Sequence, residues 1–86
     1  MSNSDRKLKI RYYVRLVKYH GAVINQYSSI KYNKALKVYN DYVERCSGFN
    51  WRLIRQTTTS YTTDDGRITM KRIEEFELFR HTSSKN

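Results

Sequence analysis

Arginine and tyrosine side chains alternate with apolar ones in the first part of the sequence. Arg11, Tyr13 and Arg15 recur at every second residue, so in an extended strand all three point to the same side. A guanidinium group neutralises phosphate, and an exposed tyrosine ring offers a stacking surface worth about 1–3 kcal/mol per nucleic-acid base. The chemistry that this spacing predicts is the binding of a nucleic acid on an open sheet face.

The candidate residues for such a surface come from three predicted strands, a turn and a helix. They are Arg11, Tyr13, Arg15, Lys18, Tyr19, Tyr27, Lys31, Lys34, Lys37, Arg52 and Arg55. The cations would contact phosphates, and the tyrosines would stack on bases or form hydrogen bonds. A purely structural role is the alternative, because arginine–tyrosine pairs on neighbouring strands also stabilise a face that meets only water.

Residue types that carry catalysis or bind metals are few and scattered. Cys46 is the only cysteine, while His20 is expected in a turn and His81 in a tail. Each of the three glycines is explained by a turn or a helix end, so the sequence has no glycine-rich phosphate loop. We therefore expect no enzymatic activity, no cofactor and no metal site.

Acidic side chains cluster only near the C-terminal end, at Glu74, Glu75 and Glu77. On a strand, Glu75 and Glu77 point to one face and Glu74 to the other. We expect Glu75 and Glu77 to accept hydrogen bonds from Arg52 or Gln56 on the neighbouring strand.

The net charge is distributed unevenly along the chain. Residues 1–55 contain twelve Lys/Arg and three Asp/Glu, whereas residues 56–86 contain five of each kind. The first segment thus carries the whole formal charge of +9. A field confined to one part of a small protein attracts and orients an anionic partner, either a nucleic acid or an acidic protein surface.

Hydrophobic periodicity predicts four strands and one helix. Alternation favours strands near 8–19, 22–30, 50–61 and 67–79, and apolar residues at helical spacing favour a helix over 33–47. Asn33 is the expected N-cap and Gly48 the left-handed stop. This order gives an α+β fold, a ββαββ two-layer sandwich with one helix on a mainly antiparallel sheet of order 2-1-3-4.

The side-chain pattern also predicts two faces for this sheet. The helix should cover the side that carries Val14 and its apolar neighbours at spacing two. The other side should carry Arg11, Tyr13, Arg15, Val17, Tyr19, Asn25, Tyr27, Arg52, Ile54 and Gln56.

Turn residues predict the register of both hairpins. A bulged turn with a left-handed Gly21 pairs Leu16 with Ile24 and Ile10 with Ile30. In the second hairpin, a two-residue turn at Asp65-Gly66 pairs Tyr61 with Met70, Thr59 with Arg72, Thr57 with Glu74 and Leu53 with Leu78.

The threonine-rich stretch 57–63 should extend beyond the helix as a two-stranded arm, because the strands are longer than the helix. Such a ribbon fits a major groove. The simpler explanation is that threonine is favoured on exposed strands, and Asp64-Asp65 at the tip would repel phosphate.

Length and hydropathy predict a single domain over residues 7–80, with disordered tails at 1–6 and 81–86. The sequence has no apolar run long enough to span a membrane. We expect a soluble, cytoplasmic protein that is a monomer or a weak dimer.

The segment Trp51-Arg52-Leu53-Ile54-Arg55-Gln56-Thr57-Thr58-Thr59, followed by a short turn and a glutamate-rich strand, resembles small uncharacterised bacteriophage proteins. The resemblance implies a single-domain accessory protein inside a host cell. Such proteins often inhibit or adapt a host protein by stoichiometric binding, which is the alternative to nucleic-acid binding. The resemblance transfers no functional residues.

Overall fold

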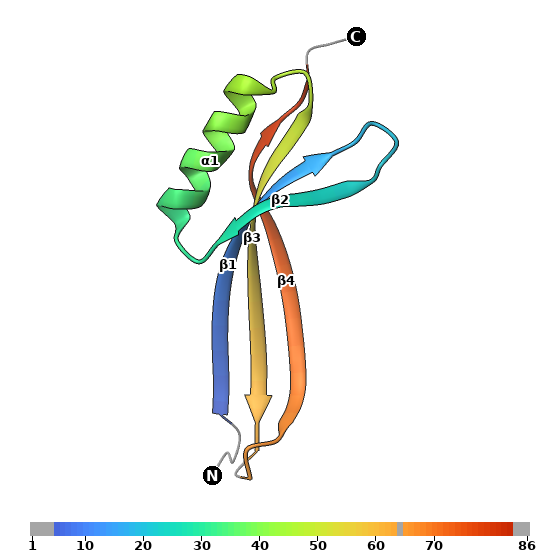
Figure 1. Ribbon diagram of the computed structural model, residues 1–86. Coiled ribbons are helices and arrows are strands. Elements are labelled where there is room, and N and C mark those ends of the chain that lie inside the picture. The colour runs from blue at the N-terminus through green and yellow to red at the C-terminus, as the bar shows by residue number, and fades with distance from the viewer. Residues whose placement is uncertain (1–4, 64, 84–86) are drawn as a thin grey trace.

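The computed structural model describes residues 5–63 and 65–83 as four strands and one helix. The elements are β1 (Asp5–Val17), β2 (Val23–Ser29), α1 (Tyr32–Arg45), β3 (Asn50–Thr62) and β4 (Ile68–His81). The strands form one antiparallel sheet in the order β2-β1-β3-β4, with α1 against one face (Figure 1). The predicted α+β class, ββαββ order and strand order are confirmed.

The first and last strands in the sequence extend further than the sequence indicated. β1 begins at Asp5, so residues 5 and 6 belong to the sheet rather than to an N-terminal tail. At the other end, His81 closes β4, and its Nε2 lies 2.9 Å from the carbonyl oxygen of Ser47. Of the predicted C-terminal tail, Ser83 also contacts the fold, since its N–H donates to Asn50 Oδ1 at 2.7 Å. Residues 1–4 and 84–86 lie outside the described residues.

The hydrophobic core lies between α1 and the upper half of the sheet. Val14, Leu53 and Trp51 from the strands pack with Ala35 and Tyr39 from the helix, and all five are buried. Around them pack the half-buried side chains of Tyr12, Leu16, Tyr27, Leu36, Val38, Tyr42, Val43, Cys46 and Leu78. This arrangement confirms the predicted helix face of β1 and places Trp51 and Tyr39 in the core.

The lower half of the sheet has no helix over it. A 14-residue helix is about 21 Å long, whereas a 13-residue strand spans about 43 Å. Residues 5–11 of β1, 56–62 of β3 and 68–75 of β4 therefore continue past α1 as a single-layer extension, here called the arm (Figure 1). The arm has three strands instead of the predicted two, and it gives the molecule a length of 57 Å.

The two hairpin turns share one hydrogen-bonding pattern. In the first, the N–H of Lys18 donates to the carbonyl of Ala22, and the N–H of Gly21 donates to that of Lys18. In the second, the N–H of Thr63 donates to the carbonyl of Arg67, and the N–H of Gly66 donates to that of Thr63. Both glycines have positive φ, 97° and 84°, so each turn is the bulged kind predicted for Gly21. The predicted two-residue turn at Asp65-Gly66 is therefore wrong.

In the first hairpin the register is right near the turn and shifts by one residue further along; in the second it shifts next to the turn, between Tyr61 and Thr62, and again between Ile54 and Leu53. In the first hairpin Leu16 pairs with Ile24 as predicted, but β2 inserts an extra residue, Gln26, between the partners of Arg15 and Val14. Val14 consequently pairs with Tyr27, and the predicted pairing of Ile10 with Ile30 does not form. Because one residue exchanges the faces of a strand, this bulge turns Tyr27 toward the core.

The second hairpin contains an equivalent bulge. The predicted pairs Tyr61–Met70, Thr59–Arg72 and Thr57–Glu74 are present. Leu53, however, pairs with Phe79 rather than with Leu78, because Leu78 is the extra residue of a bulge. Leu78 packs on the core, and the Phe79 ring lies 6.1 Å from the ring of Tyr39.

The helix begins and ends without the caps expected from the sequence. Lys31, not Asn33, is the N-cap, and no side chain caps the helix N–H groups. At the other end Gly48 is not in the left-handed region. The indole N–H of Trp51 instead donates to the carbonyl of Cys46 at 2.9 Å, which ties the end of α1 to β3.

Leu53 tests how far stability depends on the covered half of the sheet. Its side chain is fully buried, whereas that of Leu8 in the arm is 56% exposed. We predict that Leu53→Ala lowers the free energy of unfolding by about 2–5 kcal/mol, since it leaves a cavity in the core. Leu8→Ala should lower it by less than about 1 kcal/mol. Urea unfolding followed by circular dichroism measures both, and equal losses would contradict this assignment of the core.

Candidate nucleic-acid interface

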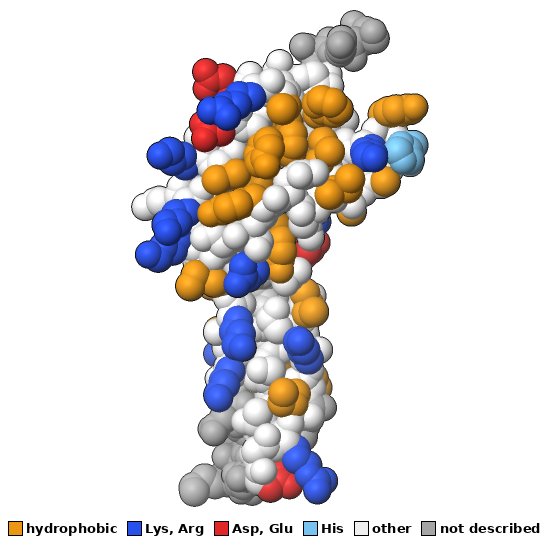
Figure 2. Space-filling model, viewed as in Figure 1, with side chains coloured by type: hydrophobic (Ala, Val, Ile, Leu, Met, Phe, Trp, Pro, Cys, Tyr) orange, Lys and Arg blue, Asp and Glu red, His pale blue; other side chains and the backbone are white. Residues whose placement is uncertain are grey.

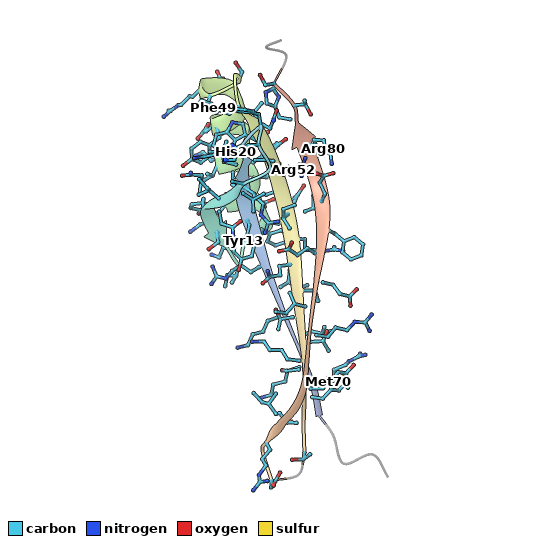
Figure 3. All side chains as sticks on the ribbon, turned by 90° about the vertical axis from the view of Figure 1, so that its right-hand side faces the viewer. Tyr13, His20, Phe49, Arg52, Met70 and Arg80 are labelled. Atoms are coloured by element: carbon cyan, nitrogen blue, oxygen red, sulfur yellow. The ribbon has the colours of Figure 1, made fainter. Side chains whose placement is uncertain are left out.

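The face of the sheet opposite α1, here called the open face, contains most of the arginines proposed for binding. Tyr13 pairs with Ile54, Arg15 with Arg52, and both pairs point away from the buried Val14–Leu53 pair. Figure 3 shows the side chains of Tyr13, Arg52 and Arg80 along this part of the sheet. The predicted open-face positions of β1 and β3 are therefore confirmed.

Arg15 crosses the open face to reach an acid on the far strand. Its two terminal nitrogens donate to the two carboxylate oxygens of Glu75 at 3.1 and 2.9 Å, and its Nε donates to Asn25 at 2.8 Å. One side chain thus joins β2, β1 and β4 across the intervening β3. On β3, Ile54 is only 5% exposed although no helix covers this face.

The remaining open-face groups form a second set of polar contacts. Gln56 donates to Glu75 at 3.1 Å, and the Tyr13 hydroxyl donates to Gln56 at 3.5 Å. Glu77 lies between Arg52 at 3.1 Å and Arg80 at 3.0 Å. The expectation that Glu75 and Glu77 serve as acceptors for Gln56 and Arg52 is confirmed.

Charge pairing alters the protonation of the acid that receives Arg15. The hydrogen bonds from Arg15 lower the pKa of Glu75 below its ordinary 4.5, with Gln56 adding to the effect and partial burial opposing it. The same hydrogen bonds raise the pKa of Arg15. These arginines are therefore committed to neighbouring carboxylates, which reduces the charge that the open face can offer to a phosphate.

The three tyrosines proposed as a stacking surface lie in three different surroundings. Tyr13 is half-buried and hydrogen-bonded, and Tyr27 packs on the core because of the bulge at Gln26. Tyr19 is 98% exposed at the tip of the first hairpin, next to His20. The prediction that Tyr27 joins Tyr13 on the open face is wrong, and the described residues contain no cluster of tyrosines there.

Exposed cations without a carboxylate partner follow a different part of the molecule. Lys7, Lys9 and Arg11 project from the open-face side of β1 in the arm, and Lys31, Lys34 and Lys37 lie at the start of α1; we call these six residues the cationic edge. All six are exposed, and within the described residues none lies within ion-pair distance of a carboxylate. Figure 2 shows Lys and Arg side chains following one long side of the molecule from the helix down the arm.

Chain topology explains why the helix and the arm meet at this edge. β2 ends at Ser29, opposite Tyr12, so β1 has no partner on that side for the rest of its length. The chain then turns through Lys31 into α1, where the Tyr32 ring lies 5.4 Å from that of Tyr12. The start of the helix is thereby held beside the exposed edge of the arm.

The helix terminus adds to the positive potential. The first turn of α1 contains no acidic residue, and no side-chain cap offsets its free N–H groups. A helix N-terminus carries about half a positive charge, and basic residues beside it are electrostatically unfavourable. Lys31 and Lys34 nevertheless flank this terminus.

Lys7 and Lys9 were not among the candidate residues predicted from the sequence. Their signal was the alternating basic run from Arg6 to Arg11, which is typical of the solvated side of any strand. Only the pairing shows that this strand lacks a neighbour there. Of the other candidates, Lys18 is exposed in the first hairpin turn, and Arg55 lies on the helix side, with its guanidinium 5.2 Å from the centre of the Phe76 ring.

Neither a metal centre nor a membrane-spanning segment is visible in the described part of the chain. No three His, Cys, Asp or Glu side chains come together there in a way that could hold a metal ion. No helix among these residues has the length and apolar character needed to cross a bilayer. Comparison with known proteins finds no matching family model, curated protein or solved structure.

Glu75→Gln tests whether the Arg15–Glu75 pair stabilises the open face. Because the pKa of Glu75 is lowered by folding, its contribution is complete above pH 4.5 and is lost as the pH falls through the lower folded value. We predict that Glu75→Gln lowers the free energy of unfolding by about 1 kcal/mol at pH 7. The difference from the unmodified protein should shrink as the pH is lowered in urea titrations.

Glu44→Gln is the matched control, since Glu44 is an exposed helical residue that forms no ion pair within the described part of the chain. If both variants lose the same stability at every pH, the open-face ion pair makes no specific contribution.

Proposed function

We propose that this protein binds nucleic acid through the phosphate backbone, along the cationic edge. The observation that supports this is the segregation of its charge. Arg15, Arg52 and Arg80 are paired with carboxylates on the open face, whereas the six cations of the cationic edge are exposed and lack such partners among the described residues. Unpaired cations release counterions from a polyanion when they bind it, which drives association.

The geometry of the cationic edge suits a linear anionic chain. Lys7, Lys9 and Arg11 project from one side of a strand, about 7 Å apart. Lysine is a flexible point charge, so these side chains can adjust to the phosphates of single or double strands. The three lysines at the start of α1 extend the same row toward the upper half of the molecule.

Binding of this kind tolerates many sequences. A tyrosine platform would have provided base stacking, but Tyr13 and Tyr27 are engaged within the fold. Phosphate contacts position a nucleic acid without reading its bases. We therefore propose a non-enzymatic, stoichiometric binding protein with little sequence preference.

Replacing lysines of the arm tests this proposal. If all six cations contact phosphates, the logarithm of affinity should fall with the logarithm of salt concentration with a slope of about −4 on single strands and about −5 on duplexes. Lys7→Gln/Lys9→Gln should weaken binding and reduce the slope by between about 1 and 2. Fluorescence anisotropy of labelled DNA and RNA over a salt series measures both quantities.

Lys18→Gln/Arg67→Gln is the control, because it removes the same net charge from the two hairpin turns. It should retain the slope of the unmodified protein. Equal losses in the two double variants would mean that net charge alone drives binding. Absence of binding to DNA and RNA at low salt would reject the proposal and direct the search to an acidic protein partner.

A further inference from the structure

The outer side of β4 is a long sheet edge. β4 pairs with β3 along its inner side, and among the described residues no strand pairs with its outer side (Figure 1). Such an edge presents a row of unpaired backbone N–H and C=O groups, which are ready to pair with another strand. Met70, Ile73 and Phe76 on this strand are each more than half exposed. Figure 3 shows Met70 near the lower end of β4, well below α1.

The charges on this edge are complementary to themselves. Around Ile73 the sequence of β4 reads Lys71-Arg72-Ile73-Glu74-Glu75. Two copies aligned antiparallel, with Ile73 opposite Ile73, bring Arg72 opposite Glu74 and Lys71 opposite Glu75 on each side of the twofold axis. Four opposite-charge pairs result, and this register contains no like-charge pair. Sliding one strand by three residues, so that Glu74 meets Glu75, instead places acids opposite each other.

Apolar residues on both sides of these charges also pair with each other in this register. In this register Met70 lies opposite Phe76, so an exposed apolar side chain meets another on each side of the centre. Met70, Arg72, Glu74 and Phe76 point to the helix side of the sheet, and Lys71, Ile73 and Glu75 point to the open face. Every proposed pair joins residues of the same face, as an antiparallel sheet requires.

We propose that the partner of this edge is a second copy of the chain, which pairs antiparallel through Met70–Phe76 about a twofold axis at Ile73. The two sheets then continue into one sheet of eight strands. A twofold interface needs a surface complementary to itself, which the charge sequence of β4 provides. Arg72 already lies 3.3 Å from Glu74 of its own chain. In the dimer, Arg72 and Glu74 of both copies would therefore form a group of four charges in which each cation has an acid on two sides.

The net charge of +9 does not oppose this arrangement strongly. Within the paired arms the strand order becomes β1-β3-β4-β4-β3-β1, so the two rows of Lys7, Lys9 and Arg11 lie about 24 Å apart. This distance is roughly three Debye lengths at physiological ionic strength. Both cationic edges remain free, and this inference therefore does not depend on the proposed nucleic-acid binding.

Charge reversal at Arg72 and Glu74 tests the register directly. The unmodified protein should sediment as a reversible dimer in a concentration series. Arg72→Glu alone, or Glu74→Arg alone, creates two like-charge pairs across the axis and should weaken dimerisation about tenfold or more. An equimolar mixture of the two single variants restores both pairs and should form heterodimers with nearly the original affinity, and so should homodimers of the double variant Arg72→Glu/Glu74→Arg.

The mixture separates contacts between chains from contacts within a chain, because mixing cannot repair a defect inside one molecule. Rescue in the mixture supports the proposal. A chain that stays monomeric up to about 1 mM, single variants that dimerise like the unmodified protein, or a mixture without rescue would each overturn it. Circular dichroism verifies that each variant is folded.

A cysteine at the axis gives a second measurement if a charge variant does not fold. In a Cys46→Ser background, Ile73→Cys places two cysteines opposite each other, at a distance that a disulfide can bridge. It should form a covalent dimer under mild oxidation much faster than Met70→Cys, whose neighbour across the axis is Phe76. Equal rates for the two variants would contradict the register.

Discussion

The length difference between the helix and the strands determines most of this structure. One 14-residue helix can cover only about 21 Å of strands that run for about 43 Å. Every buried hydrophobic residue that packs against α1 therefore lies in one half of the sheet, around Val14 and Leu53. The other half is a single layer, on which no second layer packs among the described residues.

Charge follows the same division. On the open face of the upper half, Arg15 and Arg52 are held by Glu75 and Glu77, and these ion pairs lie over a sheet face that has no second layer. Ile54 is buried on this face although no helix packs there, so the ion-paired side chains around it shield it from water. In the arm and at the start of α1, the lysines have no such partners among the described residues. The cations of the cationic edge therefore differ from Arg15 and Arg52, which carboxylates hold on the open face.

The sequence predicted the order and type of the elements because hydrophobic periodicity and turn residues are local signals. It also predicted the strand order, since an antiparallel sheet with one helical crossover leaves few alternatives. It did not predict the bulges at Gln26 and Leu78. Each is a choice between two registers that differ by one residue, and the choice depends on packing from other elements. The bulge at Gln26 places the ring of Tyr27, rather than the amide of Gln26, against the core, which avoids burying a polar group.

The same limit applies to the candidate site. Arginines in alternation indicated a basic sheet face, and the glutamates were expected to meet Arg52 or Gln56. Nothing local showed that Arg15 reaches across β3 to Glu75, or that the part of β1 before Tyr12 has no β2 residue beside it. Lys7 and Lys9 became candidates only because of that missing neighbour. Long-range pairing, rather than composition, decides which of these cations is free.

An NMR titration with a short single-stranded oligonucleotide tests the central claim most directly, because it reports on each backbone amide separately. The division of charge described above predicts that signals of residues 7–11 and 31–37 shift together on binding. Signals of Arg15, Arg52 and Arg80 should change little, since their side chains stay paired with Glu75 and Glu77. Shifts concentrated on Arg15, Arg52 and Arg80, with residues 7–11 and 31–37 unaffected, would contradict the account.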